Sequence, residues 1–450
     1  MTRTHDVPLL PPDAAQALQR IPSCEQIDLL LPDGNGLLRG KRITRDALDK
    51  VYRDGVCLPM SLIATDITGN TVEETGLGYA IGDEDRLCFP IPGTLQPVPW
   101  APVPSAQLLL AMRDDAGGPL ELAPRHVLAR VLARLRARGL SPVIAVELEF
   151  YLFDPLADGR PQPPLQAHSG LRNDSVQVYY MQELDDQRGF TDAVAQACRA
   201  QGIPADTAVA EYAPGQFEIN LKHRGDALML KRAIKAIAQQ QGLLASFMAK
   251  PFAAQSGSGL HLNVNLLDAA GDNVFAGTAQ APADALRHAI GGLQRSADDC
   301  LLLFAPHANS YRRFVPNAFV PLNDSWGFNN RTVAMRVPHS DPANTRIEHR
   351  IAGADANPYL VDAAVLAGIE HGLQHRFDPG PPVQGNAYVQ TEIRHPDWRG
   401  AIAGFLASDF VAEQLGARFR HVYGQQKRRE MLDFHAQVSD MDYRWYLRTV

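Results

Sequence analysis

The segment AVELEFYLF, residues 145–153, puts two acidic side chains into what is otherwise an apolar strand. Side chains two residues apart on a strand point to the same face, so Glu147 and Glu149 lie next to each other. Like charges repel, and burying a carboxylate is costly unless it is paired or hydrogen-bonded. The segment therefore predicts a strand whose polar face serves a charged ligand rather than a plain hydrophobic core.

The composition is that of an ordinary globular protein, with 450 residues, 45% of them hydrophobic and 21% charged. Such a chain can bury a large core, and its length suggests about two or three domains. The net charge of −7 argues against a nucleic-acid partner. No apolar run reaches about 18 residues and the N-terminus lacks a signal-peptide core, so we expect no membrane partner and a cytoplasmic location. Five scattered cysteines without a CxxC pair predict neither a disulfide framework nor a zinc ribbon.

A proline-dense stretch, PVPWAPVPSAQ at residues 97–107, marks the predicted domain boundary. Residues 1–20 form a proline-rich N-terminal segment that we expect to be loose or lightly docked. Residues 21–106 are rich in turns and strands, and QIDLLLPDGNGLLRGKRI predicts a hairpin around its DGNG turn. In residues 107–450, alternating strands are separated by amphipathic helices such as LAPRHVLARVLARLRARGL. This pattern predicts an α+β fold in which helices pack on one face of a sheet.

Other strand-like segments carry the same unusual acidic residues. Glu211 and Glu218 flank a Pro-Gly turn in AEYAPGQFEINL, and LHLNVNLL places His261 and Asn263 on one face. Any one of these positions fits a solvated strand edge equally well. Together they do not, because two carboxylates about 4 Å apart repel by about 4 kcal/mol at an effective dielectric of about 20. Oxygen ligands with a single imidazole suit Mg²⁺ or Mn²⁺ better than zinc. The predicted metal ligands are Glu147, Glu149, Glu211, Glu218, His261 and Glu348.

A set of arginines lies in a region rich in Gly, Asn and Pro that also contains Glu348. Arginines are usually solvated surface residues, but next to predicted divalent metals they are typical of phosphoryl transfer from ATP. The sequence has no GxxxxGK[ST] loop and no kinase-type glycine loop, so a nucleotide would bind in another way. The SGSGLH segment, residues 256–261, allows a small ligand to approach the backbone closely. The set comprises Arg312, Arg313, Arg331, Arg336, Arg346 and Arg350.

Six segments, in this order, resemble the signature blocks of the glutamine synthetase family: VELEFYLF, AEYAPGQFEINL, SGSGLHLNV, NSYRRFVP, NNRTVAMRVP and RIEHRIAGADANPYL. The resemblance covers residues from about 110 to 450 and extends weakly into the N-terminal part. It implies a small N-terminal β-grasp domain followed by a large catalytic α/β domain with an antiparallel-rich, funnel-shaped sheet. It also implies a homo-oligomer, a hexamer or a dodecamer, with active sites at the subunit junctions.

The resemblance also implies roles for individual residues. The ligands of a first metal would be Glu149, Glu211 and Glu218. The ligands of a second metal, which also touches ATP phosphate, would be Glu147, His261 and Glu348. The glutamate-binding groups would be Arg313, Arg350 and the backbone near Gly257. The phosphate contacts, which stabilise the transferred phosphoryl, would be Arg331, Arg336 and Arg346. Arg313 and Arg331 are the expected catalytic arginines.

Two positions depart from the ammonia-using members of this family. Phe319, in SYRRFVPNAFVP, stands where those members carry a glutamate on a flap that binds ammonium. Phenylalanine offers apolar area and a weak cation–π face instead of a negative charge. We therefore expect ammonia to be a poor substrate and a bulky amine to be favoured, with Trp326 and Phe328 nearby; the alternative is that Phe319 only packs the flap. Asn263 replaces a histidine of the family, and we expect altered ATP contacts there.

The sequence thus predicts an ATP-dependent ligase that joins the γ-carboxyl of L-glutamate to an organic amine through γ-glutamyl phosphate. Its cofactors would be at least two Mg²⁺ or Mn²⁺ ions per subunit. A bulky, apolar monoamine is the favoured substrate, and a polyamine is the close alternative. Three further hypotheses remain open: a true glutamine synthetase that uses ammonia, a catalytically silent structural homologue, and a sensor of glutamate or nucleotide.

Overall fold

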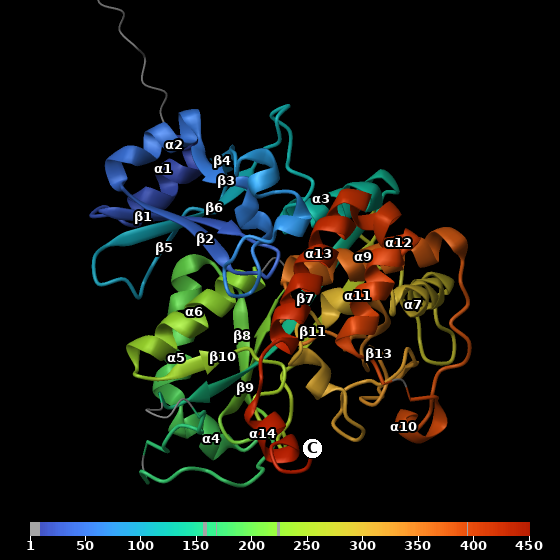
Figure 1. The fold of residues 1–450 in the computed structure, drawn as a ribbon. Coiled ribbons are helices and arrows are strands. Elements are labelled where there is room, and N and C mark those ends of the chain that lie inside the picture. Colours follow the sequence, from blue (N-terminus) through green and yellow to red (C-terminus); the bar gives the residue numbers. More distant parts are fainter. Residues whose placement is uncertain (1–9, 156–159, 168, 223–225, 394) are drawn as a thin grey trace, which may run out of the picture.

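The computed structural model describes residues 10–155, 160–167, 169–222, 226–393 and 395–450. Two β-sheets organise the described chain, a smaller one at the N-terminus and a larger one that carries most of the predicted site residues (Figure 1). The two expected parts of the fold, an N-terminal β-sheet domain and a mixed α/β domain, are confirmed. Within the described residues, no helix combines the length and the apolarity that a membrane crossing requires.

The N-terminal sheet has the strand order β2-β1-β6-β4-β3, with β5 paired to β6. The β1–β2 pair is the predicted hairpin, and its turn is closed by the Asp33 N–H, which donates to the Leu37 carbonyl at 2.9 Å. Gly36 has a φ of +74°, which a glycine adopts without strain. The strands are β1 (Gln26–Pro32), β2 (Leu38–Thr44), β3 (Val56–Pro59), β4 (Asp85–Pro90), β5 (Gln96–Pro97) and β6 (Ser105–Met112).

Two predictions for this part of the chain change in the structure. The N-terminal segment is not loose throughout, because α1 (Pro12–Gln19) buries Ala14 and Ala17 in the core. The predicted boundary between residues 106 and 107 falls inside β6, which pairs with both β1 and β4. The proline-dense stretch therefore leads into the last strand of the first sheet, and that sheet extends to Met112.

The larger sheet has the order β12-β13-β14-β11-β7-β9-β8, with β10 paired to β7. Every pair in it is antiparallel except β12–β13. The long acidic strand β7 lies in its middle, because its alternating apolar residues pack into the core on one face. The strands are β7 (Ser141–Phe153), β8 (Ala205–Ala210), β9 (Gln216–Leu221), β10 (Leu244–Ser246), β11 (Leu260–Leu267), β12 (Trp326–Phe328), β13 (Met335–Val337) and β14 (Ile347–His349).

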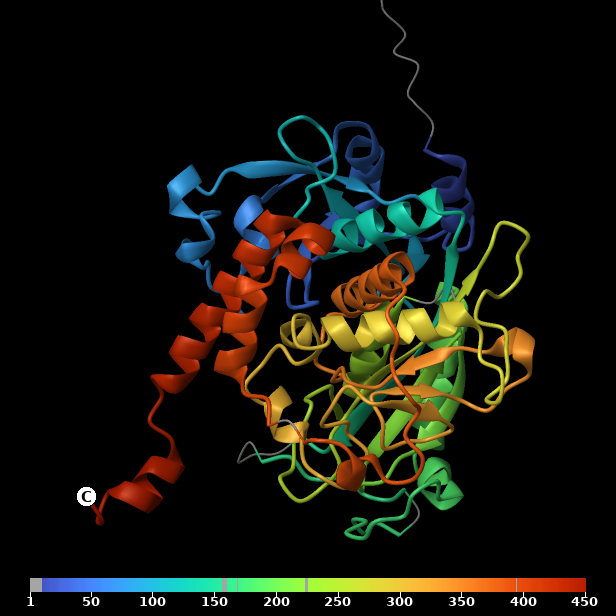
Figure 2. The ribbon, with the colours of Figure 1, turned by 90° about the vertical axis from the view of Figure 1, so that its right-hand side faces the viewer.

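Helices cover the larger sheet, and two of them, α7 and α9, lie side by side (Figure 2). Glycines allow this close packing, since a Cβ on Gly292 would come within 2.1 Å of the Gly368 carbonyl oxygen. The longer helices are α3 (Pro124–Ala137), α5 (Arg188–Gln201), α6 (Ala227–Gln240), α7 (Asp284–Ser296), α9 (Pro358–His375), α11 (Trp398–Ala407) and α13 (Ala417–His435). The shorter ones are α2 (Leu48–Asp54), α4 (Met181–Asp186), α8 (Leu301–Phe304), α10 (Ala387–Gln390), α12 (Asp409–Val411) and α14 (Asp440–Tyr446).

A buried ionic cluster joins α13 to the N-terminal domain. Lys427 Nζ donates to Glu430 Oε2 at 3.0 Å and also to Asn35 Oδ1 in the hairpin turn. The Ile67 N–H donates to Glu430 Oε1 at 2.9 Å, and His307 Nδ1 lies 3.5 Å from Glu430 Oε2. Burial raises the pKa of Glu430, but the charges and hydrogen bonds of Lys427 and His307 outweigh burial and lower that pKa to about 2.

Replacing Lys427 with methionine should destabilise the protein by about 3–5 kcal/mol, because it leaves the Glu430 carboxylate buried without its cation. The exposed Arg429, which pairs with Asp433 on the same helix, is the matched control. Arg429→Met should cost less than about 1 kcal/mol. Urea unfolding at neutral pH measures both changes. Equal effects of the two substitutions would contradict an energetic role for this cluster.

The same cluster predicts a pH dependence. A carboxyl whose folded pKa is depressed stabilises the fold above its unfolded pKa of about 4.3, and that contribution disappears as pH falls through the folded value. For Glu430 the window runs from about pH 4.3 down to about 2. The stability difference between the unaltered chain and Lys427→Met should therefore shrink across this window, which urea unfolding at pH 7 and pH 3 would detect.

Candidate active site

Strand register places most of the predicted ligands on one face of the larger sheet. Directly opposed residues of antiparallel strands share a face, and the structure opposes Glu147 to His261 and Glu149 to Glu218. Asn263 lies two residues beyond His261 and is opposed to Glu348. The four central strands therefore present one continuous polar surface. We call it the acidic face; it comprises Glu147, Glu149, Glu218, His261, Asn263 and Glu348.

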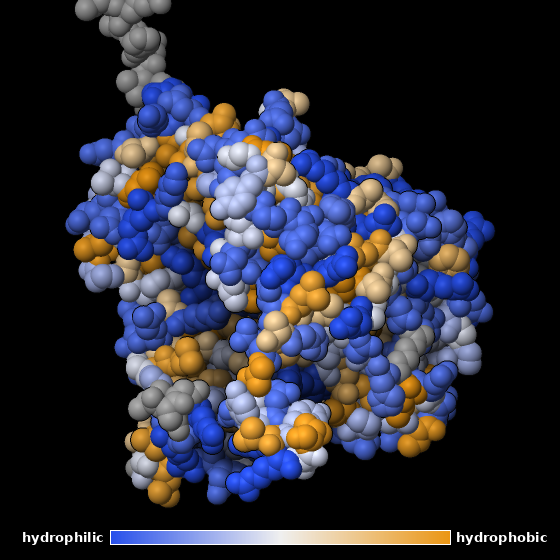
Figure 3. All heavy atoms as spheres, in the orientation of Figure 1, coloured by the Kyte–Doolittle hydropathy of each residue, from blue (hydrophilic) through white to orange (hydrophobic). Residues whose placement is uncertain are grey.

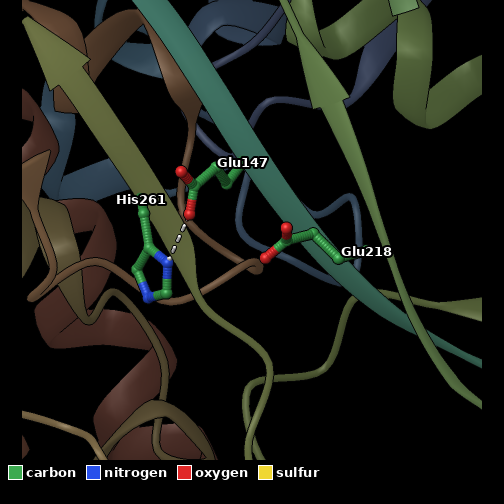
Figure 4. Close-up of side chains that lie close together, drawn as sticks. All are labelled: Glu147, Glu218 and His261. Carbon is green, nitrogen blue, oxygen red and sulfur yellow. Dashed lines mark hydrogen bonds and ion pairs between the residues drawn. The ribbon is translucent and has the colours of Figure 1, made fainter. Parts of the chain in front are cut away.

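Three of these side chains converge tightly. Glu147, Glu218 and His261 each offer a ligand atom, and these atoms all lie within 4.8 Å of one another. Figure 4 shows the three side chains pointing toward a common space from β7, β9 and β11. His261 Nδ1 is 3.2 Å from Glu147 Oε2. Two carboxylates and one imidazole are a donor set that suits Mg²⁺ or Mn²⁺, so the residues present fit a divalent cation.

The carboxylates of this region repel one another strongly. Burial raises the pKa of Glu218 to about 9, and the charges of Glu147, Glu149 and Glu211 add to the effect. Burial and the Glu149 charge likewise raise the pKa of Glu211 to about 7, although Arg331 opposes them. Glu147 differs, because its contacts with His261 and Asn263 outweigh burial and lower its pKa to about 2. A bound cation would relieve this repulsion, which supports the fit inferred from the donor set.

The remaining predicted ligands have other partners. Glu149 Oε2 accepts the Gly259 N–H at 2.7 Å and the Gln216 side chain at 3.4 Å. Glu211 follows directly after β8 and close to the Pro-Gly turn, as expected. Glu348 is buried, and both of its oxygens contact guanidinium groups. Arg336 Nη1 donates to Oε2 at 2.6 Å, and Arg350 Nη1 donates to Oε1.

The arginines predicted to bind substrate are buried beside the acidic face. Arg313 donates to the Ile351 carbonyl at 2.7 Å and to the Arg350 carbonyl at 3.3 Å. Burial lowers the pKa of Arg313, and the charge of Glu149 opposes that effect. Gly257 lies directly against this side chain, because a Cβ there would come within 2.7 Å of Arg313 Cγ. The predicted glutamate-binding residues are therefore neighbours.

The residues predicted to contact ATP lie on or next to the acidic face. Asn263 connects two charges, since it donates to Glu147 Oε1 at 3.0 Å and accepts from Arg346 Nε at 2.9 Å. Arg331 lies close to Tyr179 and Glu348, whose charges raise its pKa although burial opposes them. Arg336, as described above, is bound to Glu348, and its other nitrogen donates to Asn329 Oδ1 at 3.0 Å. All three predicted phosphate-binding arginines thus border the acidic face.

Phe319 is 53% exposed and has a φ of +54°, which is uncommon for a residue with a side chain. Its carbonyl accepts from Arg350 Nη2 at 3.4 Å, so its backbone touches the predicted substrate-binding arginine. Trp326, which we expected near Phe319, does not present its ring to solvent. Trp326 is 1% exposed in the hydrophobic core, because strand β12 turns its indole inward, where it donates to the Gly380 carbonyl.

Sequence reasoning missed three residues of this region. Gln216 is buried and links Glu149 to the Gly257 carbonyl, to which it donates at 3.0 Å. Asn220 is opposed to Glu147, and its side chain lies close enough to Glu218 to oppose the rise in the pKa of that carboxyl. Both could have been found, because QFEINL alternates and places Gln216 and Asn220 on the same face as Glu218. Tyr179 lies in an irregular segment and gave no periodic signal.

Comparison with known proteins agrees with this geometry. The family profile described as glutamine synthetase, catalytic domain, matches residues 121–446. Gamma-glutamylputrescine synthetase of Escherichia coli (strain K12) is 42% identical over 441 residues, which cover 96% of this chain and 93% of that protein. Glutamate–isopropylamine ligase of a Pseudomonas species is 31% identical over 429 residues, covering 92% of this chain and 93% of that protein.

Solved structures show the same fold. A structure of GmaS without ligand superposes with a TM-score of 0.82 at 28% identity, covering 97% of this chain and 99% of the other. A GmaS complex with ADP gives a TM-score of 0.82 at 27% identity, with 97% and 100% covered. With the acidic face assembled and these matches spanning nearly the whole chain, the protein belongs to the glutamine synthetase family of ligases.

Proposed function

We propose that this protein is an ATP-dependent ligase that joins the γ-carboxyl of L-glutamate to an organic amine. The observation that carries the proposal is the acidic face: it offers three potential metal ligands whose atoms lie within 4.8 Å of one another, and the buried Arg313 and Arg350 lie beside it. The names of the relatives support the same reaction class, since one is a gamma-glutamylputrescine synthetase and another a glutamate–isopropylamine ligase.

The reaction proceeds in two steps, phosphorylation of glutamate and attack by the amine. The γ-phosphoryl group of ATP moves to an oxygen of the glutamate γ-carboxylate, which gives ADP and an acyl phosphate. The neutral nitrogen of the amine then attacks the acyl carbon, inorganic phosphate leaves, and the nitrogen loses a proton. When bound, Mg²⁺ or Mn²⁺ supplies positive charge to the phosphoryl oxygens.

The chain's own residues bind, orient and neutralise the reactants. The residues that would hold the metal ions are Glu147, Glu149, Glu211, Glu218, His261 and Glu348. Arg313 and Arg350, with the Gly257 backbone, would hold the carboxylates of glutamate, because guanidinium groups match carboxylate geometry. Arg331, Arg336 and Arg346 would neutralise the phosphates, and Arg331 is exposed enough to reach the transferred group. Preorganised charges of this kind lower the barrier without reorganising during the reaction.

Phe319 supports an organic amine rather than ammonia. An exposed aromatic side chain can pack against the carbon skeleton of an amine, whereas it offers ammonium no negative charge. We favour a monoamine with a bulky, apolar body. The second candidate substrate is a diamine or polyamine, and it is favoured by the 42% identity to gamma-glutamylputrescine synthetase.

Phosphate release with glutamate, ATP and Mg²⁺ tests the proposal across isopropylamine, benzylamine, putrescine and ammonium. At least one organic amine should exceed ammonium in kcat/KM by about tenfold or more. The best substrate separates the monoamine from the polyamine candidate. Dominant activity with ammonium would instead identify a true glutamine synthetase. Absence of turnover together with absence of any ATP- or Mn²⁺-induced thermal shift would indicate a silent homologue.

We further propose that the protein is a homo-oligomer, a hexamer or a dodecamer. Support comes from α14, which projects away from the rest of the chain in Figure 2 and exposes the apolar side chains of Met441, Trp445 and Leu447. Figure 3 shows orange atoms in this region, among several such patches on a mostly hydrophilic face. Light scattering coupled to size-exclusion chromatography measures the assembly, and a monomer at micromolar concentration would contradict the proposal.

An Asn263→Ala variant tests the assignment of this residue to ATP. It breaks the link between Glu147 and Arg346, so the guanidinium loses its fixed orientation. We expect KM for ATP to rise about tenfold, the cost of about one charge-assisted hydrogen bond, while KM for glutamate stays within about twofold. Asn265→Ala is the matched control, because Asn265 lies two residues further along β11 and on the same face. A larger change in KM for glutamate than for ATP would contradict the assignment.

A further inference from the structure

The acidic face continues along β7 as an aromatic surface. Strand alternation places Tyr151 and Phe153 on the same face as Glu147 and Glu149. Tyr151 is fully buried, and its ring stacks on Phe153 with the ring centroids 5.6 Å apart. The ring of Phe252 meets Tyr151 edge-on at 5.7 Å, and Phe252 belongs to the segment that leads from β10 into the SGSGLH loop. This end of the face therefore supports that loop.

The loop, which we call the glycine–serine loop and define as residues 255–259, is anchored through its carbonyl oxygens. Tyr151 donates its hydroxyl hydrogen to the Ser256 carbonyl at 2.7 Å, and Gln216 Nε2 donates to the Gly257 carbonyl at 3.0 Å. Tyr151 and Gln216 are directly opposed in the β7–β9 pair, so they reach the loop from adjacent strands. The successive carbonyls of residues 255–258 thus accept from four buried donors: Lys250 Nζ, the Tyr151 hydroxyl, Gln216 Nε2 and the Ala354 N–H.

Other polar groups of the loop remain available to a ligand. Within the described residues, the hydroxyl groups of Ser256 and Ser258 are buried and have no hydrogen-bond partner. A buried polar atom without a partner costs free energy, and such atoms cluster where a ligand supplies the missing bond. The loop therefore has its acceptors bonded to the protein, while two of its donors are left for a bound molecule.

The neighbours of the loop leave little room for it to move. A Cβ on Gly257 would come within 2.7 Å of Arg313 Cγ and within 2.6 Å of the Ala249 carbonyl oxygen. A Cβ on Gly259 would come within 2.9 Å of His261 Nε2. Since Arg313 is the residue proposed to hold glutamate and His261 a proposed metal ligand, a shift of the loop would displace both.

We propose that Tyr151 is a positioning residue for glutamate, whose hydroxyl, together with Gln216, fixes the glycine–serine loop at the place where the Gly257 backbone meets the substrate. The inference rests on the proposed function, because it takes glutamate as the ligand of this loop. Burial and the Glu149 charge raise the pKa of Tyr151, so its phenol stays protonated and donates at neutral pH. The hydroxyl acts on the substrate through the loop and takes no part in proton transfer.

Tyr151→Phe tests the proposal, because it removes one oxygen and keeps the ring that stacks on Phe153. We expect KM for glutamate to rise about tenfold, the effect of about one buried hydrogen bond, while kcat and KM for ATP stay within about twofold. Tyr359→Phe is the matched control, since Tyr359 is also buried but its hydroxyl donates to Asp226, at the start of α6. The control should lower stability without changing KM for glutamate.

Hydrogen exchange in the absence of substrates gives a readout that does not depend on activity. The N–H groups of Ser258 and Gly259 are both hydrogen-bonded, and that of Gly259 donates to Glu149 Oε2 at 2.7 Å. Both should exchange slowly in the unaltered chain. Tyr151→Phe should speed this exchange about tenfold, because it weakens an anchor of the loop, and Tyr359→Phe should leave it unchanged.

Three results would overturn the proposal. An unchanged KM for glutamate in Tyr151→Phe would mean that the hydroxyl only satisfies a buried carbonyl. Parallel losses in kcat and in both KM values would indicate a general disturbance of the site. Unchanged exchange of the loop would show that Tyr151 does not hold it. Each of these results leaves the proposed function intact if the unaltered chain turns over glutamate, whereas an unaltered chain that neither binds nor uses glutamate would contradict the proposed function and this inference together.

Discussion

A Glu218→Gln variant should be more stable than the unaltered chain in metal-free buffer at pH 8 and almost inactive with Mg²⁺. Glu218 is buried among Glu147, Glu149 and Glu211, which raises its pKa to about 9, so at pH 8 the folded chain must keep this carboxyl protonated whereas the unfolded chain ionises it. Glutamine needs no such proton. We expect the free energy of unfolding to rise by up to about 5 kcal/mol, the equivalent of the nearly four pH units between the unfolded pKa of about 4.3 and pH 8. Loss of a metal ligand should lower kcat on the order of a thousandfold, because charge neutralisation by metal ions contributes several kcal/mol.

Thermal denaturation with and without Mg²⁺ separates these two effects. Saturating metal should raise the Tm of the unaltered chain and leave that of Glu218→Gln nearly unchanged. Glu25→Gln, at an exposed position, is the control for the chemical change itself. If Glu218→Gln is less stable without metal and still responds to Mg²⁺, the acidic face is not a metal site.

Exchanging Phe319 for glutamate should shift the reaction from organic amines toward ammonia. A carboxylate within about 4 Å of ammonium is worth about 4 kcal/mol at intermediate dielectric, whereas the phenyl ring contributes apolar contact only. We expect kcat/KM for ammonium to rise by about tenfold to a hundredfold and that for the best organic amine to fall by at least about tenfold. The same phosphate-release assay measures both.

The positive φ at Phe319 determines which control is informative. Glutamate and glutamine both carry a Cβ, so each meets the same backbone strain as phenylalanine. Phe319→Gln therefore keeps the backbone cost and the size while omitting the charge. It should lose activity with the organic amine without gaining activity with ammonium. If the two variants behave alike, the charge at this position does not select the amine.

Local signals explain why much of the fold could be predicted. The DGNG turn sets the β1–β2 hairpin, and helix α3 lies where its apolar spacing and its terminal glycine indicate. The shared face of Glu147 and Glu149 follows from strand periodicity alone. Helix α1 was not predicted, because two buried alanines give little hydrophobic signal in a proline-rich segment.

The candidate site could be predicted in its residue types but not in its pairings. The alternation of side chains along a strand predicts the face on which Glu348 lies. The neighbouring sequence does not show that Arg336 and Arg350 each contact one of its two carboxylate oxygens. The contact with Arg336 depends on the register of β13 against β14, and both contacts depend on side-chain rotamers. The inward orientation of Trp326 likewise depends on which face of a short strand meets the core, and three residues are too few to define a period.

The double pairing of Glu348 has a consequence for the sequence of binding events. Its carboxylate lies between the guanidinium groups of Arg336 and Arg350. Arg350 also donates to the backbone carbonyl of Phe319. Any ligand that draws an oxygen of Glu348 away releases an arginine, which then has donors to offer an incoming anion. The binding of a cation and the binding of an anion would thus be coupled rather than independent. The backbone at Phe319 would respond to both, because Arg350 contacts it.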